Sequence, residues 1–318
     1  MNKIGVLSNP LSRSNKRHLR GVEEFLALHQ DVIHLRLENF ELLHGLLLEF
    51  AAADVDVLVI NGGDGTISAV LTEIFEREAF AQPPIIAVLP GGTSNTIARD
   101  VGMLGNRVSS LRRLVHIVRT ADCQRYVQER PLIRVSYDQE ASAVVGMFFG
   151  TAGVCDAVSL RRRIFPQSWI PDPLAGGLTL LYVLANVIIG RLERVLTSHE
   201  IDVAFDPDAH CPQRYSALIA TTLKRIFLGS YPFWGDTRQN LHVTSIRSPA
   251  SDLVRQAYRL LYGKDKQNLP TSTYRSESVE CVELHMQCAF NLDGEFFNPS
   301  PNTPVALSSA YTARFLQC

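Results

Sequence analysis

The sequence predicts an α/β fold in two parts, an N-terminal three-layer domain built on a parallel sheet and a C-terminal β-sandwich domain. Strand and helix signals alternate over the first third of the chain, which is typical of a parallel sheet covered by helices. From about residue 131, strand signals dominate instead. A length of 318 residues is also large for one hydrophobic core. We therefore expect an N-terminal domain at residues 1–130 and a β-rich domain at residues 131–296.

Apolar patterns place the elements of the N-terminal domain. The β-branched run at residues 55–60 is typical of a parallel strand that is buried on both faces. Apolar residues from Ile67 to Phe75 recur at helical spacing, which predicts an amphipathic helix. By the same criteria we expect strands at 4–7, 32–37, 55–60 and 85–89, and helices at 16–28, 40–53, 67–75 and 95–101.

In the second domain, short strand-like runs are joined by polar turns. An apolar stretch from Leu178 to Gly190 is shorter than the roughly 20 residues that a membrane-spanning helix needs, so we expect a buried helix there. The strands of this domain are expected at 133–137, 143–149, 201–205, 215–221, 241–246 and 279–284.

The overall charge and the cysteines narrow the class of protein. The formal net charge is −1, so no global positive field attracts nucleic acid, and we expect no nucleic-acid partner. The six cysteines form no C-x-x-C pair, which argues against a zinc site and against a disulfide framework. The first residues lead directly into a strand and do not resemble a signal peptide. We therefore expect a cytoplasmic protein.

A glycine-rich segment, Asn61-Gly62-Gly63-Asp64-Gly65-Thr66, lies where a buried strand ends and a helix begins. Ligands of open α/β sheets bind at this end of the strands, and a helix N-terminus with free backbone N–H groups attracts anions. Thr66 is expected to cap the helix through its hydroxyl group. A carboxylate beside a phosphate site is repulsive unless a cation or a transferable proton is present. Asp64 is therefore a candidate magnesium ligand or proton acceptor.

A second segment has the same layout, because Leu89-Pro90-Gly91-Gly92-Thr93-Ser94-Asn95 also joins a strand to a helix. Two such loops on neighbouring strand ends could hold a polyphosphate from two sides. Neither is a Walker A loop, and neither fits Gly-x-Gly-x-x-Gly. Far along the chain, Asp293-Gly294-Glu295 offers two carboxylates around a turn, one suited to a metal and the other to a substrate hydroxyl.

Together these segments resemble the diacylglycerol kinase catalytic family, which includes bacterial lipid kinases and the sphingosine and ceramide kinases. The first loop alone is shared with NAD kinases and phosphofructokinases, whereas the whole set is more specific. The matching segments are Asn9-Pro10, Gly63-Asp64-Gly65-Thr66, Pro90-Gly91-Gly92-Thr93-Ser94-Asn95 with Ala98-Arg99, and Asp293-Gly294-Glu295, with weaker matches at Asp122 and Phe149-Gly150-Thr151-Ala152-Gly153.

The resemblance implies an ATP-dependent kinase that uses Mg²⁺ and phosphorylates a lipid hydroxyl, with diacylglycerol or a related glycerolipid as the leading substrate. It implies that the N-terminal domain binds the nucleotide, with the tail at about 297–318 completing it, and that the second domain binds the lipid. Asp64 and Asp122 would hold the metal, and Asp293 and Glu295 would supply the base, with Asp64 as the alternative. The implied nucleotide-binding residues are Asn9, Gly62, Gly63, Asp64, Gly65, Thr66, Ile67, Ser68, Ala69, Gly91, Gly92, Thr93 and Asn95.

Two other functions stay open. One is an NAD kinase-type enzyme with a soluble substrate, and the other is a catalytically silent protein that binds a lipid or a nucleotide. Many family members have an aspartate where this chain has Thr96, which weakens a three-acid metal network. A lipid substrate implies contact with a membrane surface, here the inner face of the cytoplasmic membrane. Both a monomer and a homodimer are compatible with the sequence.

Overall fold

The computed structural model describes residues 2–92, 94–101, 105–120, 123–140, 143–164, 197–204, 212–226, 229–250, 252–263 and 265–317. The chain divides into two compact units. Unit 1 comprises Met1–Leu132, Val144–Gly146 and Tyr311–Cys318, and unit 2 comprises Ile133–Ala143 and Met147–Ala310.

The sheet of unit 1 has the strand order β15-β4-β3-β1-β2, and its β1–β2, β1–β3, β3–β4 and β4–β15 pairs are parallel. Its strands run over Ile4–Ser8 (β1), Val32–Arg36 (β2), Val57–Gly62 (β3), Ile85–Pro90 (β4) and Val305–Leu316 (β15). Helices cover Asn15–Ala27 (α1), Leu43–Ala52 (α2), Asp64–Phe75 (α3), Thr96–Asp100 (α4) and Arg107–Thr120 (α5), and a 3₁₀ turn at Phe40–Leu42 precedes α2.

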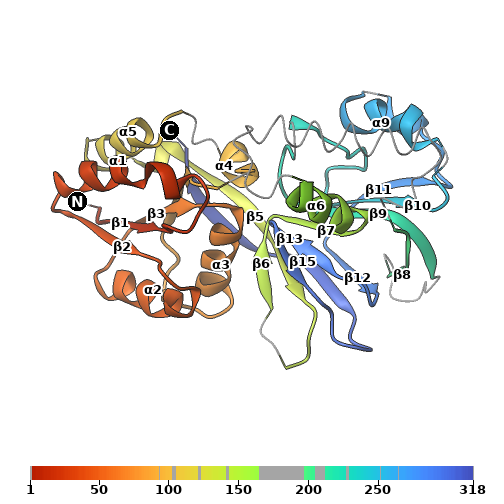
Figure 1. Ribbon diagram of the computed structural model, residues 1–318, viewed down its shortest axis with the longest axis horizontal. Coiled ribbons are helices and arrows are strands. Elements are labelled where there is room, and N and C mark those ends of the chain that lie inside the picture. The colour runs from red at the N-terminus through yellow and green to blue at the C-terminus, as the bar shows by residue number, and fades with distance from the viewer. Residues whose placement is uncertain are drawn as a thin grey trace. The chain divides into compact units, whose positions relative to one another are not determined.

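Helices cover both faces of this sheet (Figure 1). One core joins Leu19, Val22 and Phe25 of α1 and Leu111 and Leu114 of α5 to alternate residues of β1, β3 and β4. On the other face, a Cβ atom at Gly5 would meet the ring of Phe50, which belongs to α2. Because neighbouring residues of a strand point to opposite faces, α2 lies across the sheet from α1. Unit 1 therefore has the three layers that the sequence predicts.

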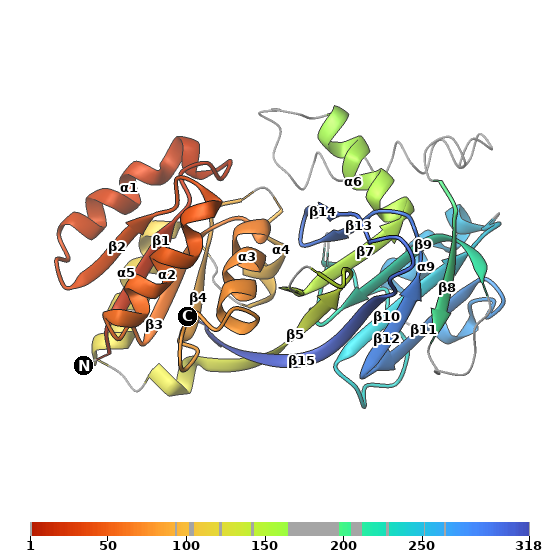
Figure 2. The ribbon, with the colours of Figure 1, turned by 90° about the horizontal axis from the view of Figure 1, so that it is seen from below.

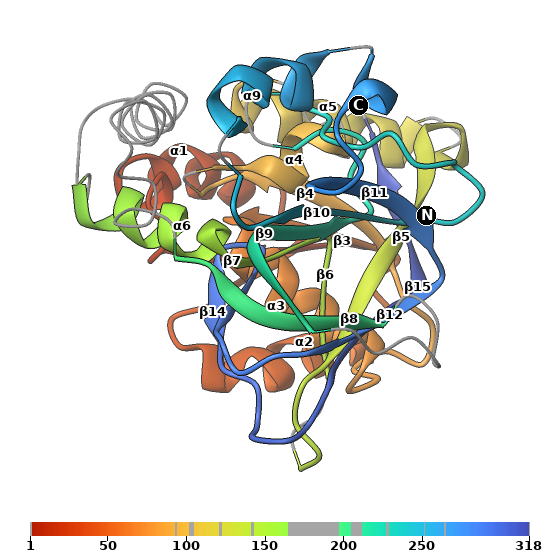
Figure 3. The ribbon, with the colours of Figure 1, turned by 90° about the vertical axis from the view of Figure 1, so that its right-hand side faces the viewer.

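Unit 2 is built from antiparallel strands (Figure 3). They span Phe148–Ala152 (β7), His199–Ala204 (β8), Gln213–Thr221 (β9), Leu241–Arg247 (β10), Tyr274–Val279 (β11), Cys281–His285 (β12), Phe290–Leu292 (β13) and Glu295–Phe297 (β14). In the described part of unit 2, the strands are accompanied by the helices Gly153–Ile164 (α6) and Leu253–Tyr262 (α9), and a 3₁₀ turn lies at Lys266–Asn268. The prediction of a mixed α/β fold with a parallel N-terminal sheet and antiparallel C-terminal strands is confirmed.

Two long strands contain residues of both units, Val127–Ser136 (β5) and β15 (Figure 2). After β5, the short strand Val144–Gly146 (β6) returns to unit 1, where Val145 N donates to Thr72 Oγ1 at 2.9 Å and Ser68 Oγ donates to Val145 O at 2.7 Å. Strand β15, which pairs with β4 in the sheet of unit 1, comes from the C-terminal end of the chain.

Some element boundaries differ from the prediction. The expected strand at 143–149 is broken at Met147 into β6 and β7, and α6 and α9 were not predicted. The helix predicted at Ile67 begins at Asp64, with Gly63 as its N-cap, so the predicted capping by Thr66 is wrong. The predicted helix that includes Leu178 to Gly190 lies outside the described residues. Within the described residues, no helix is long and apolar enough to cross a membrane.

Candidate nucleotide site

The two glycine loops begin at the same edge of the sheet of unit 1. Strands β3 and β4 are parallel neighbours, and their register pairs Asn61 with Leu89 and Gly62 with Pro90. Since the strands end side by side, the chain leaves both of them at the carboxyl edge of the sheet, where α/β proteins bind ligands.

The backbones of the two loops lie in direct contact. A Cβ atom on Gly92 would lie 2.4 Å from Gly63 Cα, and one on Gly91 would lie 3.0 Å from Gly62 N. In addition, Gly91 N donates to Gly62 O at 2.9 Å. Glycine is required at Gly92 because any side chain would push the loops apart. The two loops therefore form one structural unit.

Asp64 links the two loops through its side chain. The carboxylate oxygens accept hydrogen bonds from Thr96 N at 3.0 Å and Ile97 N at 3.1 Å, which are the first two residues of α4. Asp64 thus caps α4 from another helix, a favourable place for a negative charge. Burial raises the pKa of the Asp64 carboxyl above its ordinary value, while the two amide hydrogen bonds and Arg99 act in the opposite direction.

Asn95 closes the second loop. Its backbone is left-handed, with φ at 49°, a conformation that asparagine tolerates better than most residues. Its side-chain oxygen accepts from Gly92 N at 2.8 Å, and its amide donates to Gly92 O at 3.1 Å. Thr93, between these two residues, lies outside the described residues.

A third segment, after β1, is fixed to the first loop. Asn9 Nδ2 donates to Thr66 Oγ1 at 2.9 Å, and Asn9 Oδ1 accepts from Leu11 N at 2.9 Å. Asn15 joins this segment to β3, because its amide donates to Asn9 O at 2.8 Å and to Asn61 O at 2.9 Å. The predicted residues Asn9, Gly62, Gly63, Thr66, Gly91, Gly92 and Asn95 are therefore brought together in one region.

The first turn of α3 is the part of this region suited to an anion. The N–H groups of Asp64 and Gly65 lie in that turn, where a helix has no acceptor of its own for them. The positive end of the α3 dipole points the same way. Ile67 and Ser68, by contrast, are buried, and the Ser68 hydroxyl donates to Val145 O, while Ala69 is half-buried. These three residues build α3 and do not lie in its first turn.

The acids of the Asp-Gly-Glu segment lie in unit 2. Asp293 is buried, and its carboxylate accepts from Met147 N at 2.8 Å and Phe148 N at 2.9 Å. Its backbone is left-handed, with φ at 48°. The side chain of Glu295 is 59% exposed, and Arg162 lies at an N–O distance of 4.0 Å from it. Of the two acids, Glu295 is the one that can reach a ligand from solvent.

The residues fit a polyphosphate better than a metal held by the protein alone. Both Asp64 oxygens already accept an amide hydrogen bond, and Asp122 lies outside the described residues. Within the described part of the chain, no group of three His, Cys, Asp or Glu side chains could hold an ion. A Mg²⁺ ion at Asp64 would take most of its ligands from phosphate oxygens and water, as Mg²⁺ commonly does.

Several residues that hold the region together were not among the predicted site residues. Asn15 and Asn61 are buried, and Arg107 donates to Ser14 Oγ at 2.7 Å and to Asn15 Oδ1. At the other end of α4, Asp100 pairs with Arg130 of β5, and both side chains are buried. Asn61 directly precedes the first loop, so its position was a usable signal. The other partners are distant in sequence and carry no local pattern.

Part of the chain is similar in sequence to known proteins. Residues 3–126 match the diacylglycerol kinase catalytic domain. Two curated relatives, each named "Probable lipid kinase YegS-like", come from Enterobacter sp. (strain 638) and Stenotrophomonas maltophilia (strain K279a). The first is 41% identical over 49 residues and the second 46% identical over 50 residues. Each match covers 15% of this chain and 16% of the relative.

A crystal structure of a diacylglycerol kinase from Bacillus anthracis str. Sterne has a similar fold. The TM-score is 0.63 at 14% sequence identity, over 100% of this chain and 97% of that chain. The structural likeness extends over both units, whereas the sequence match is confined to the part that contains both glycine loops. The sequence similarity to the diacylglycerol kinase catalytic domain therefore covers residues 3–126.

Proposed function

We propose that the protein is a kinase that transfers the γ-phosphate of ATP to a hydroxyl group of a lipid, with diacylglycerol or a related glycerolipid as the acceptor. The observation that carries this proposal is the contact between the two glycine loops at the carboxyl edge of β3 and β4. Two loops held as one unit can bind a polyphosphate from two sides. The names of the curated relatives favour a lipid as the acceptor.

In this proposal the residues of unit 1 position the nucleotide. The Asp64 and Gly65 amides in the first turn of α3 bind phosphate oxygens, and Asp64 contributes to a Mg²⁺ site. Bound Mg²⁺ would neutralise charge on the phosphates during transfer. Asp64 and Asn95 keep the loops in place, so that little reorganisation is needed at the moment of reaction.

Glu295 is the proposed base, because it is the exposed carboxylate of the Asp-Gly-Glu segment and can accept the proton of the lipid hydroxyl. Asp293 positions the segment through its bonds to the Met147 and Phe148 amides. We propose that the lipid is presented at the inner face of the cytoplasmic membrane, with the protein in the cytoplasm.

One observation favours a second candidate, a catalytically silent protein that binds a nucleotide or a lipid. Both oxygens of Asp64 and both oxygens of Asp293 are engaged by backbone amides, which is sufficient to explain each acid as a structural residue. The two candidates differ in turnover and not in ATP binding.

The test is transfer of ³²P from labelled ATP to diacylglycerol, other lipid extracts, sphingoid bases and NAD. We expect label in the diacylglycerol product. Asp64→Asn and Glu295→Gln should each lower turnover by about 100-fold or more while the protein stays folded. Glu49→Gln, an exposed substitution on α2, is the control and should leave turnover unchanged.

Other outcomes decide against the proposal. Label that enters only a water-soluble product such as phosphorylated NAD contradicts a lipid acceptor. ATP binding without label in any acceptor supports the silent protein. Wild-type rates in both acid variants would remove the chemistry assigned to Asp64 and Glu295.

A further inference from the structure

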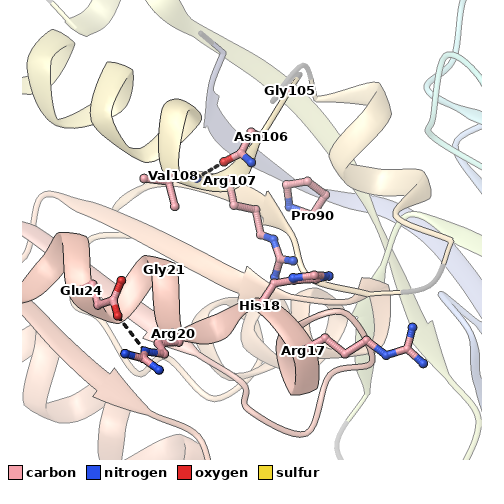
Figure 4. Close-up of a pocket in the computed structure, with 10 residues that line it drawn as sticks. All are labelled: Arg17, His18, Arg20, Gly21, Glu24, Pro90, Gly105, Asn106, Arg107 and Val108. Carbon is pink, nitrogen blue, oxygen red and sulfur yellow. Dashed lines mark hydrogen bonds and ion pairs between the residues drawn. The ribbon is translucent and has the colours of Figure 1, made fainter.

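A cleft of about 570 Å³ lies in unit 1, between α1 and the start of α5 (Figure 4). Arg17, His18, Arg20 and Glu24 line it from α1, and Arg107 lines it from α5. Its volume is in the range of small-molecule sites, about 300–1,000 Å³. Pro90 of the second loop also lines the cleft, but the residues assigned above to phosphate and Mg²⁺ binding do not.

The cleft carries an excess of positive charge. The lining contains three arginines and a single carboxylate, which leaves a net charge of +2 without His18. That carboxylate, Glu24, is itself paired with Arg20 Nε at 2.7 Å. Unit 1 therefore concentrates cations in this cleft, although the whole chain has a net charge of only −1.

Arg107 is the most informative of these residues. Its half-buried guanidinium donates to Ser14 Oγ at 2.7 Å, to Ser14 O at 3.5 Å and to Asn15 Oδ1, all of them neutral acceptors. Among the described residues, no carboxylate pairs with it, and burial lowers its pKa. A partly desolvated cation without a counter-ion is costly, and an anionic ligand would relieve that cost.

Cationic side chains line the cleft from both helices. Figure 4 shows the Arg107 side chain extending from the start of α5 toward His18. On the helix opposite, Arg20 is turned toward Glu24, and the exposed Arg17 side chain extends away from Arg107. Guanidinium groups form paired hydrogen bonds with phosphate oxygens, which makes arginine a preferred phosphate ligand. A concave site of this size suits a small molecule or headgroup and not the flat surface of a macromolecule.

We propose that the cleft between α1 and α5 is a binding site for a small phosphorylated anion, held by Arg17, Arg20 and Arg107. This site is additional to the nucleotide site and does not depend on the proposed kinase activity. Its ligand is either a soluble phosphate compound or the phosphorylated headgroup of a lipid, since both present the same chemistry to the arginines.

The test is calorimetric titration of the full chain with sodium pyrophosphate, with a saturating non-hydrolysable ATP analogue present to occupy the glycine loops. The double variant Arg17→Gln/Arg20→Gln should weaken binding by about tenfold or more, because it removes two of the three guanidinium groups that line the cleft. The control is Arg112→Gln/Arg113→Gln, which makes the same change in charge at exposed positions of α5 outside the cleft. Its dissociation constant should stay within about twofold of wild type.

A second variant tests whether binding needs the paired N–H donors of the Arg107 guanidinium group. Arg107→Lys keeps the charge but loses the paired donors, and we expect binding about tenfold weaker. Urea unfolding of each variant confirms that the protein is folded. Co-sedimentation with phosphatidylglycerol vesicles distinguishes a lipid headgroup from a soluble phosphate compound as the ligand. Arginine-dependent binding to vesicles without binding to pyrophosphate assigns the cleft to a lipid headgroup. The proposal is overturned if neither probe binds, or if Arg17→Gln/Arg20→Gln binds both as the control does.

Discussion

The carboxylates of Asp64 and Asp293 each accept two backbone N–H groups, and each fixes a segment distant in sequence. Asp64 caps α4, and Asp293 holds the turn between β6 and β7. Such contacts do not exclude a role in phosphate transfer, because each oxygen keeps a second lone pair. They do mean that substitutions at either acid change structure as well as charge. Glu295 has no such amide contact in the described structure, which makes it the cleaner probe of chemistry.

Asp293→Asn should destabilise the protein. Asparagine tolerates the left-handed backbone at this position. Its side-chain NH₂ group, however, would replace one of the two carboxylate oxygens that accept the Met147 and Phe148 N–H groups, so one of these N–H groups would lose its acceptor. A buried donor left without a partner costs about 1–3 kcal/mol. We therefore expect a lower urea midpoint, followed by circular dichroism, than in the control Glu280→Gln, whose side chain is exposed. Equal midpoints would show that the two amides contribute little.

Cys155 provides a prediction about pH. Burial, followed by the neighbouring Cys288 and Asp156, raises the pKa of the Cys155 thiol to about 12. The thiolate is the reactive form, and only about one Cys155 thiol in 10⁴ is ionised at pH 8, a fraction that rises about tenfold per pH unit up to the pKa. Iodoacetamide at pH 8 should therefore label the exposed Cys281 and leave Cys155 unmodified. Peptide mapping by mass spectrometry measures both sites, and rapid labelling of Cys155 would contradict its burial.

The glycine loops could be located from the sequence because each is a local motif. Gly62 to Thr66 and Gly91 to Asn95 are each contiguous in the chain, and the structure brings the two loops into contact. Their assignment to a nucleotide stays a prediction. Asn15, Arg107 and Arg130 act through partners that are far away in sequence, so no spacing rule identifies them. The capping of α4 by Asp64 was hidden for the same reason, because the two residues that it joins are 32 positions apart.

At the scale of elements, the contact between the loops explains why glycine occupies position 92. Gly92→Ala would place a Cβ atom 2.4 Å from Gly63 Cα, so the loops must separate. Overpacking of this kind costs about 1–3 kcal/mol. We expect a lower melting temperature and ATP binding weakened by about tenfold, measured by calorimetry.

The matched control is Gly45→Ala in α2. No atom lies within 4 Å of the added Cβ at this exposed position, and alanine favours a helix over glycine by up to about 1 kcal/mol. The control should therefore raise the melting temperature slightly without changing ATP binding. If both variants behave alike, the contact between Gly63 and Gly92 has no special importance.

Strands and helices of unit 1 were predicted well because their apolar periodicity is strong and each buries a continuous face. Helix α3 began earlier than predicted because Gly63 is its N-cap and Asp64 and Gly65 are already helical. Helix α9 has apolar residues at helical spacing, so its sequence did contain a usable signal. Helix α6 begins with a glycine and ends in an arginine run, and this composition concealed it.

At the scale of the whole molecule, unit 1 depends on residues from the end of the chain. Phe315 pairs with Ile86 across β15 and β4, and Phe315 and Leu316 are fully buried. A chain that ends at Ala310 loses both, and removal of a buried Phe or Leu side chain typically costs about 2–5 kcal/mol. This loss is comparable to the whole stability of a domain, about 5–15 kcal/mol.

We therefore expect trypsin to cleave unit 1 rapidly in the chain that ends at Ala310. The control chain ends at Leu316 and keeps both buried residues. Mass spectrometry of the fragments locates the cuts. Equal resistance of the two chains would show that β15 is dispensable for unit 1.

The position of β15 also has a consequence for synthesis on the ribosome. The glycine loops lie within the first 95 residues, but the strand beside β4 emerges only after all of unit 2. Domains generally fold in order from the N-terminus during translation. Here the edge of β4 stays unpaired while unit 2 is made, and an unpaired edge is prone to aggregation. Most of unit 1 is therefore translated first, yet unit 1 stays incomplete and open to misfolding until the end of synthesis.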